Sequence, residues 1–384
     1  MTGMDIRSSR AGRLVQQPAG CRAFIPAPLP PAPAIQLGPD ILVQLSHADQ
    51  ALGRLDGQTQ TLPNPELFVA MYVRREAVLS SQIEGTQSSL EDILDYELDQ
   101  TGRDLPPDVD EVVNYVRAMN HGLERLSALP LSLRLIREIH RELLAGVRGA
   151  ERSPGEFRAT QNWIGPRGAP LAKAGYVPPP VEEMHPALAA FERFLHRERQ
   201  LPVLIHCALA HAQFETIHPF LDGNGRVGRL LITFLLCFRG VLHRPMLYLS
   251  HYLLRNRSEY YDRLMAIREQ GDWEAWIKFF LRAVGETAEE ATSTSNAIVE
   301  LRERHRSLVQ EHGLGSNGLR MLDLLFQRPL INVKLIANAM DVTFATANKL
   351  VREFEQMRLL EETTGGERNR RFRYAPYLSL FPSE

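Results

Sequence analysis

The sequence has few cysteines, no long apolar run and no excess of either charge. Its three cysteines, Cys21, Cys207 and Cys237, lie far apart and form no CxxC pair, so neither a disulfide framework nor a zinc knuckle is expected. The most apolar run, Leu230–Phe238, is far below the roughly 18–20 residues needed to span a bilayer and predicts a buried helix. No apolar segment follows the N-terminal arginines, which disfavours a secretory signal. We therefore expect a cytoplasmic protein with no membrane partner.

The charge balance and the length restrict the class of protein further. Lys and Arg number 44, Asp and Glu number 46, and the formal net charge is −2. This balance excludes a polycationic nucleic-acid coat and an acidic tail, although a locally basic face is compatible with it. A chain of 384 residues favours two or three domains. No internal repeat is evident, which disfavours a solenoid.

The composition divides the chain into four regions in a mainly α fold. They are an extended Pro-rich tail at 1–37, a helical region at 38–110, a helical core at 111–312 and a separate domain at 316–384. In the tail, the prolines between Phe24 and Pro33 exclude a helix or a central strand, and the first ~20 residues are expected to be flexible. Helices are expected near 65–84, 88–99, 107–128, 131–147, 182–198, 202–217, 225–239, 257–269 and 272–312.

The last region has the pattern of three short helices and a hairpin. The helices are expected at 317–326, 332–340 and 343–359, with a turn at Asp341. After them, Gly365-Gly366 between two alternating stretches predicts a β-hairpin. This order of elements predicts a winged helix-turn-helix domain.

The most informative stretch is His218-Pro-Phe-Leu-Asp-Gly-Asn-Gly-Arg-Val-Gly-Arg229. One helix is expected to end just before it and another to begin inside it, with a tight turn between them that holds Gly223, Asn224 and Gly225. Successive backbone N–H groups in such a turn point into one concavity, and the positive end of the following helix dipole adds to them. The turn is therefore expected to bind an anion.

Four side chains around this turn complete a site for phosphoryl or nucleotidyl transfer. Arg226 and Arg229 lie three residues apart on one helix face and can reach the same polyphosphate. Asp222 is a suitable ligand for a Mg²⁺ ion that bridges phosphate oxygens. His218 can accept a proton near neutral pH. Each residue alone is more often structural, so the inference depends on their combination and order.

The same stretch resembles the motif of the Fic family, HPF-x-[D/E]-GNGR-x-x-R, at every specified position. The resemblance implies a Fic helical core with a small flap hairpin. It also implies transfer of AMP from ATP, with Mg²⁺, to a Tyr, Ser or Thr hydroxyl of a target protein, itself included. The implied roles are a base for His218, a Mg²⁺ ligand for Asp222, an anion cradle for Gly223, Asn224 and Gly225, and β- and γ-phosphate binding for Arg226 and Arg229. Family cores often pair, so a homodimer is also compatible with the resemblance.

Two more regions acquire an interpretation from this resemblance. Gln161–Tyr176 resembles the family's flap, which registers the target segment by backbone pairing; the alternative is a plain surface connection. Asn256, Tyr260 and Tyr261, with Tyr252 as a weaker candidate, correspond to the border of the adenine pocket. The alternative is that these aromatic side chains belong to the core.

A second motif resembles the family's inhibitory segment, [S/T]-x-x-x-E-[G/N], and consists here of Ser80, Glu84 and Gly85. Ser80 and Glu84 are four residues apart and share a helix face. Glu84 is expected to form a bidentate pair with Arg229 and so to restrain transfer; the alternative is a solvated glutamate near a helix end. Some restrained family members also remove AMP with the same glutamate, which leaves a reverse hydrolase activity open.

The C-terminal domain suggests DNA as a partner. Four residues are expected near the start of its third helix, where a recognition helix meets base edges: Thr343, Phe344, Thr346 and Asn348. Four arginines in the wing suit phosphate contact: Arg368, Arg370, Arg371 and Arg373. Against DNA, the third helix also carries Glu353 and Glu355, and the domain could equally dock a protein.

Two functions therefore remain, and a third is rejected. The first is a protein adenylyltransferase restrained by Glu84. The alternative is a DNA-binding transcriptional regulator whose Fic core only senses a nucleotide. A zinc enzyme built on His206, His211 and His218 is rejected, because their spacings of five and seven do not suit a helical zinc pair and no HExxH is present.

Overall fold

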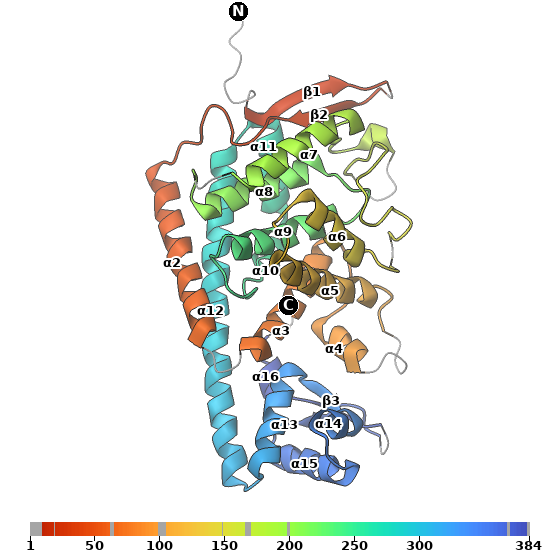
Figure 1. Cartoon of the computed structure of the whole chain (residues 1–384), viewed down its shortest axis with the longest axis vertical. Coiled ribbons are helices and arrows are strands. Elements are labelled where there is room, and N and C mark those ends of the chain that lie inside the picture. Colours follow the sequence, from red (N-terminus) through yellow and green to blue (C-terminus); the bar gives the residue numbers. More distant parts are fainter. Residues whose placement is uncertain are drawn as a thin grey trace, which may run out of the picture.

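The computed structural model describes residues 10–18, 20–61, 65–98, 105–147, 149–165, 170–197, 200–366 and 369–381. Figure 1 shows a helical body at one end of the molecule and a smaller C-terminal unit at the other. The long helix α12 (Trp273–Glu311) runs along both. Within the described ranges, no helix is both long and apolar enough to cross a membrane.

The helical body consists largely of helices that the sequence predicted to within a few residues. They are α3 (Pro65–Ile83), α4 (Leu90–Leu98), α5 (Val109–Leu126), α6 (Leu133–Leu143), α7 (Val181–Leu195), α8 (Val203–Ile217), α9 (Asn224–Phe238) and α11 (Arg257–Gln270). Helix α2 (Pro39–Thr61) begins the body, and the short α10 (Ser250–Arg255) was not expected. Helix α8 is the centre of this body, because its residues from Leu204 to Ile217 are all buried. Its C-terminal end, at which His218 lies, is consequently surrounded by the rest of the fold.

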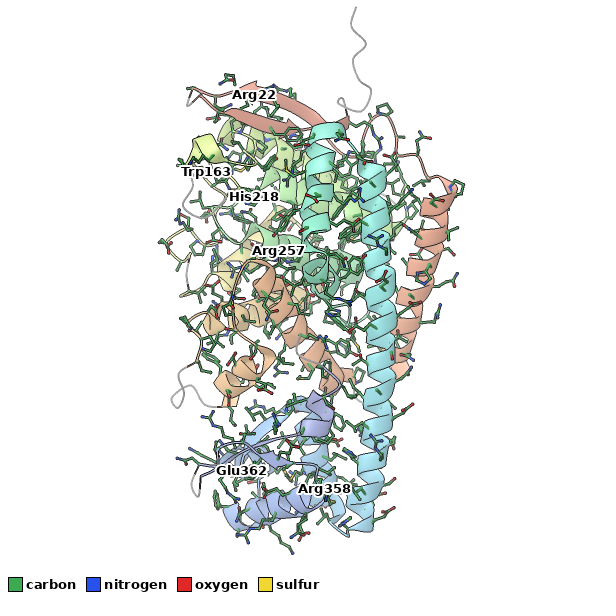
Figure 2. The ribbon with its side chains drawn as sticks, turned by 180° about the vertical axis from the view of Figure 1, so that it is seen from behind. Arg22, Trp163, His218, Arg257, Arg358 and Glu362 are labelled. Atoms are coloured by element: carbon green, nitrogen blue, oxygen red, sulfur yellow. The ribbon has the colours of Figure 1, made fainter. Side chains whose placement is uncertain are left out.

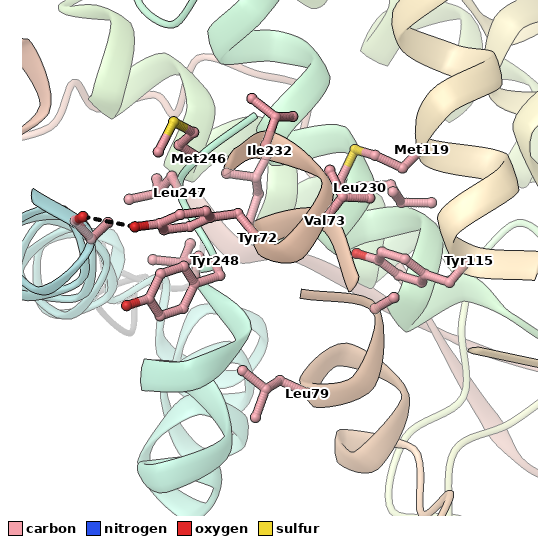
Figure 3. Close-up of a cluster of buried hydrophobic side chains, with 14 of the residues drawn as sticks. Tyr72, Val73, Leu79, Tyr115, Met119, Leu230, Ile232, Met246, Leu247 and Tyr248 are labelled. Carbon is pink, nitrogen blue, oxygen red and sulfur yellow. Dashed lines mark hydrogen bonds between the residues drawn. The ribbon is translucent and has the colours of Figure 1, made fainter. Parts of the chain in front are cut away.

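Helix α3 is anchored in the hydrophobic core on several sides. Figure 3 shows its Tyr72, whose hydroxyl donates to the Ala291 carbonyl of α12 at 3.0 Å. Close by lie Met119 of α5 and Leu230 of α9, which are buried like Tyr72. Helix α3 ends at Ile83, so the packing of this helix determines where Ser80 and Glu84 are held.

Contact between α5 and α9 depends on Gly122, which suggests a matched pair of variants. A Cβ at Gly122 would lie 2.3 Å from Cζ of the buried Phe234, so Gly122→Ala should lower the free energy of unfolding by about 1–3 kcal/mol. Gly57 of α2 has open space at the same position, so Gly57→Ala should raise it by roughly 0.5–1 kcal/mol. Urea denaturation measures both, and equal effects would contradict the packing described here.

The N-terminal region departs from the expected flexible tail. Strands β1 (Gly12–Gln16) and β2 (Arg22–Pro26) form an antiparallel hairpin. The N–H of Phe24 also donates to the Val177 carbonyl at 2.9 Å, so β2 has hydrogen-bond partners on both sides. The expectation of flexibility is therefore wrong for residues 10–18, and residues 1–9 lie outside the described ranges. Partners so distant along the chain leave no signal in the local composition.

Residues 315–381, called the C-terminal unit below, contain the three expected helices and a small sheet. The helices are α13 (Gly315–Gln327), α14 (Val333–Met340) and α15 (Phe344–Gln356), and a short α16 (Ala375–Leu378) follows. The antiparallel sheet has the order β3-β5-β4, from β3 (Leu330–Asn332), β5 (Arg371–Arg373) and β4 (Glu361–Glu362). Strand β3 was not expected, because three residues between two helices give no alternating pattern.

The C-terminal unit packs on α3 and α4. Arg371 of β5 donates to Asp95 of α4 at 2.7 Å, and each side chain is only 9% exposed. The Phe381 ring meets Tyr72 of α3 edge-on at 5.7 Å. The predicted phosphate contact by Arg371 is therefore wrong, because this guanidinium lies inside the interface with the helical body. Arg368 lies outside the described residues.

Candidate active site

His218 caps α8 in a backbone conformation that non-glycine residues rarely adopt. Its φ and ψ are 49° and 60°, and its N–H donates to the Phe214 carbonyl at 2.9 Å. Its own carbonyl accepts from Nε of Arg158 at 3.1 Å and from Nδ2 of Asn162 at 3.2 Å. A left-handed residue costs about 1–2 kcal/mol, and such strain gathers at functional sites. The histidine side chain is therefore a candidate for function.

The imidazole of His218 is held neutral. Burial lowers its pKa to about 3, and the nearby Arg268 and Arg158 act in the same direction. Its Nδ1 is buried and has no hydrogen-bond partner among the described residues. Figure 2 shows the residue between Trp163 and Arg257 in the half of the molecule that holds the helical body. At physiological pH this side chain can accept a proton.

The turn that follows is rigid. The Asn224 side chain accepts from the N–H of Phe220 and donates to its carbonyl, both at 2.8 Å. Gly223 has a φ of 76°, which favours glycine. His140 contacts the Asp222 carbonyl through Nε2 at 3.0 Å and stacks on Phe220 with ring centroids 3.7 Å apart. The side-chain amide of Asn224 thus closes the turn, whereas the predicted anion cradle concerns the backbone N–H groups of Gly223, Asn224 and Gly225.

Arg226 has an acidic partner that the sequence did not indicate. Its NH1 donates to Glu111 of α5 at 3.1 Å, and both side chains are almost fully buried. Its NH2 lies 3.7 Å from Asp222. Glu111 belongs to no recognisable motif, so only the packing of α5 on α9 identifies it. Arg226 is thereby held beside the turn.

Arg229 is held by both residues of the predicted inhibitory motif. Its Nε donates to Oγ of Ser80 and its NH2 to the Ser80 carbonyl, each at 2.8 Å, and NH2 also donates to Oε1 of Glu84 at 2.7 Å. The predicted bidentate pair is therefore wrong, because Ser80 takes two of these three bonds. Gly85, with a φ of 94°, lets the chain turn away directly after Glu84.

The carboxylate of Glu84 lies against the turn. A Cβ at Gly225 would come within 2.2 Å of Oε1 of Glu84. Burial acts to raise the pKa of Glu84, but Arg229, with help from Arg226 and His218, lowers it overall. Glu84 is therefore ionised at neutral pH and occupies the space beside Gly225 and Arg229.

Asp222 fits a magnesium ion that arrives with a nucleotide. Its side chain is 42% exposed, and its Oδ1 accepts from the N–H of Gly223 at 2.6 Å. The described part of the chain contains no group of three or more His, Cys, Asp or Glu residues able to hold a metal. Magnesium commonly takes one or two carboxylates together with substrate phosphates. The donors present suit that arrangement and not a metal held by protein alone.

The three residues proposed for adenine binding differ in their surroundings. Tyr260 is 1% exposed and its hydroxyl lies 2.9 Å from Nε2 of His211, which fits the alternative of a core residue. Tyr261 is 39% exposed, with Arg257 at 5.8 Å from its ring. Asn256 donates through Nδ2 to the Tyr252 carbonyl at 3.0 Å. Of the candidates Tyr252, Tyr260 and Tyr261, the first two are buried and the ring of Tyr261 is exposed.

The segment Gln161–Tyr176 begins and ends as a paired hairpin. Ile164 and Tyr176 form an antiparallel bridge, with N···O distances of 2.8 and 3.1 Å. Trp163 and Ile164 are 40% and 36% exposed. Residues 166–169 lie outside the described ranges. We call residues 161–176 the flap below.

The remaining histidines of the rejected zinc site have structural partners. Nδ1 of His211 lies 2.9 Å from the Gly228 carbonyl, and His206 stacks on Phe194 with centroids 4.3 Å apart. Sequence reasoning missed Glu111, His140, Arg158, Asn162 and Arg268, all of which touch the site from other segments. None belongs to a motif that spacing could have revealed.

Two family models match this chain. One, described as Fic/DOC family N-terminal, matches residues 42–124, and the other, described as Fic/DOC family, matches residues 130–236. Ser80 and Glu84 fall in the first range, and His218–Arg229 falls in the second. Both sides of the candidate site therefore lie in matched segments.

Two curated relatives are insect proteins named protein adenylyltransferase Fic. The one from Drosophila grimshawi is 34% identical over 153 residues, which cover 39% of this chain and 28% of the relative. The one from Culex quinquefasciatus is 32% identical over 199 residues, which cover 49% of this chain and 36% of the relative. The match thus spans about a third of the length of these relatives.

Two solved structures share the fold. A Fic family protein from Desulfovibrio desulfuricans G20 aligns with a TM-score of 0.57 at 20% identity, covering 88% of this chain and 97% of that one. A Fic domain containing signaling protein from Bacteroides thetaiotaomicron VPI-5482 aligns with a TM-score of 0.50 at 18% identity, covering 67% and 98%. At these identities the likeness concerns the fold alone.

Proposed function

This chain belongs to the Fic/DOC family, distantly related to protein adenylyltransferase Fic, and we propose that it transfers AMP from ATP to a Tyr, Ser or Thr hydroxyl of a protein. The observation that carries the proposal is a neutral His218 at the lip of a glycine turn. Arg226 and Arg229 follow that turn on α9. In this proposal His218 is the base and the two arginines bind the polyphosphate.

In the proposed transfer step, His218 accepts a proton. The imidazole accepts the proton of the target hydroxyl, and the hydroxyl oxygen forms a bond to the α-phosphorus of ATP. The bond between the α-phosphorus and the oxygen bridging to the β-phosphate breaks, and pyrophosphate leaves with that electron pair. General base catalysis of this kind contributes roughly 10²–10⁴-fold to the rate.

The turn and α9 bind the triphosphate. Backbone N–H groups at the start of α9 and the positive end of its dipole favour phosphate, and Arg226 and Arg229 offer planar forks of donors. Asp222 would hold Mg²⁺, which when bound would neutralise part of the phosphate charge. Tyr261, with its open ring, is the best placed of the expected residues to border the adenine.

Ser80 and Glu84 restrain this reaction in our proposal. They occupy the Arg229 guanidinium with three hydrogen bonds, so a γ-phosphate must displace the Glu84 carboxylate to reach it. A reverse reaction, in which Glu84 assists a water molecule in removing AMP, uses the same residues and is a second activity of the proposed site.

Intact-mass measurement tests the proposal directly. The Glu84→Gly variant, incubated with Mg²⁺ and ATP, should gain the mass of one adenylyl group through self-modification, and a variant that also carries His218→Ala should gain none. A gain of a phosphoryl mass instead would show a kinase-type reaction. If neither this protein nor added cell proteins gained mass, the transferase proposal would fail, and the alternative, a DNA-binding regulator, would remain.

That alternative is a DNA-binding regulator with a nucleotide-sensing core, in which the C-terminal unit is a winged helix-turn-helix. It is favoured by the exposed start of α15, where Phe344 is 62% exposed and Thr343 caps the helix. The wing favours it less, since Arg373 pairs with Glu361 at 2.9 Å and Arg370 donates to Asn348 at 3.3 Å. Sequence-specific DNA retention combined with no transfer by Glu84→Gly would support this function.

A further inference from the structure

Two buried arginines lie beside His218. Arg158 is 2% exposed and Arg268 is 8% exposed. Among the described residues, neither forms an ion pair with a carboxylate, and their hydrogen bonds go to carbonyls, a hydroxyl and a thioether. A buried cation without a counter-charge is costly. We therefore expect these two arginines to serve a function that offsets this cost.

Arg158 connects the catalytic turn to the flap. Its Nε donates to the His218 carbonyl at 3.1 Å, and its NH1 donates to the Thr160 carbonyl at 3.3 Å. Its NH2 donates to the Pro179 carbonyl, and its own N–H donates to the Pro219 carbonyl at 2.9 Å. Thr160 directly precedes the flap and Pro179 lies just beyond it, so one guanidinium holds both flap ends to the residue carrying the base.

Arg268 of α11 makes the corresponding connection from the other side. Its NH2 donates to the Glu215 carbonyl at 3.1 Å and its Nε to Oγ1 of Thr216 at 3.3 Å. Its guanidinium lies 3.9 Å from the centre of the Tyr176 ring. The Tyr176 hydroxyl in turn donates to the Thr216 carbonyl at 2.6 Å. The last turn of α8 and the end of the flap are thus joined a second time.

We propose that Arg158 and Arg268 are positioning residues, which lock the flap to the end of α8 and, as buried cations without an ion-pair partner among the described residues, keep the imidazole of His218 neutral. The last carbonyls of a helix lack partners within the helix, and cations are favourable there, which explains how two guanidinium groups persist. The kinetic part of the inference rests on the proposed function, whereas the protonation of His218 does not.

The charges around His218 agree with this assignment. Arg268 of α11 and Arg158 ahead of the flap both lower its pKa, after burial itself. Glu84, after α3, acts in the opposite direction. Glu215, on the same helix as the base, has its own pKa raised to about 7 by burial, so its carboxyl compensates the arginines only in part.

The flap connection has a consequence for the reaction. A target segment that pairs with the flap is registered against the same carbonyls that orient His218. Placing the attacking hydroxyl and its base on one locked unit limits the misalignment that would slow a transfer step. Loss of either arginine should therefore affect both the charge state of the base and the alignment.

The first experiment measures the protonation of His218 without nucleotide. NMR of histidine-labelled protein, assigned by comparison with His218→Ala, gives the pKa of this residue in the parent, in Arg158→Gln and in Arg268→Gln. Glutamine keeps one N–H donor but removes the charge, so the pKa of His218 should rise by about one pH unit or more. Arg158→Lys and Arg268→Lys should keep it low, and Arg193→Gln, on the exposed side of α7, should change nothing. A parental His218 pKa in both glutamine variants overturns the proposal.

The second experiment follows self-labelling by ATP against pH in a Glu84→Gly background. The glutamine variants should shift the acidic limb of the pH–rate profile to higher pH. The lysine variants should lower the rate tenfold or more at every pH, because lysine lacks the planar guanidinium that joins the flap to α8. If the glutamine variants do not fold, the lysine variants decide: a raised His218 pKa or a parental rate in them overturns the proposal. If Glu84→Gly itself labels nothing, the proposed function fails while the NMR result still stands.

Discussion

Replacing His218 by alanine should reduce AMP transfer by a factor of about 10²–10⁴, the range that general base catalysis contributes. The reason is that His218, at the start of the turn, is neutral, with its pKa lowered to about 3, and its Nδ1 has no hydrogen-bond partner among the described residues. ATP should still bind, because Arg226 and Arg229 lie on α9 and contact α5 and α3, not His218. Transfer of labelled α-phosphate in the Glu84→Gly background measures the first effect and calorimetry with ATP measures the second.

The matched control is His185→Ala. His185 lies exposed on α7, so its loss should leave the rate of transfer unchanged. Both variants should retain the thermal midpoint of the parent within a few degrees, since alanine adopts the helical and left-handed backbone at a similar cost to histidine. Undiminished labelling by His218→Ala would contradict the assignment of the base.

Replacing Glu84 by glycine should raise the rate of transfer by about one to two orders of magnitude, because one charge-assisted hydrogen bond is worth roughly 1.5–3 kcal/mol. The substitution removes the 2.7 Å contact with Arg229 and clears the space against Gly225. The two bonds from Arg229 to Ser80 remain, so the guanidinium keeps its position and becomes available to a γ-phosphate. Initial rates of self-labelling with ATP and Mg²⁺ measure the effect.

Three further variants separate charge from backbone flexibility. Glu84→Ala lacks the carboxylate without the freedom of glycine and should match Glu84→Gly. Glu84→Gln keeps a hydrogen-bond acceptor without the charge and should give a smaller rise. Ser80→Ala removes one of the three bonds to Arg229 and should change the rate least. A Glu84→Ala variant as slow as the parent would show that the carboxylate does not restrain transfer.

The helical body was predictable because its signals are local. The ends of α3 just before Gly85 and of α8 at Ile217, and the turn through Gly223, follow from side-chain chemistry within a few residues, and the apolar spacing marks the helices between them. The order His218, Asp222, Arg226, Arg229 was recognisable for the same reason, since these residues share one turn and one helix. The motif of Ser80 and Glu84 was also recognisable, because the two residues are one helical turn apart.

Apart from the pairing of Glu84 with Arg229, which a resemblance of motifs suggested, contacts between distant segments were not predictable. The pairing of Arg226 with Glu111, the burial of Arg371 against Asp95 and the hairpin at the N-terminus each join residues far apart in the chain. Tyr260 looked like a pocket residue, yet it lies in the core, because an aromatic spacing does not say which face of a helix is covered.

The sequence by itself determined the local features on which the proposed function depends: a histidine before a glycine turn, two arginines on the following helix and a serine–glutamate pair, each defined over a few residues. The tertiary structure alone decided that Ser80 shares Arg229 with Glu84 and that the buried Arg158 and Arg268 lie close to His218. The physical reason is that local spacing sets turns and helix faces, whereas the charge around a buried group depends on every segment packed against it.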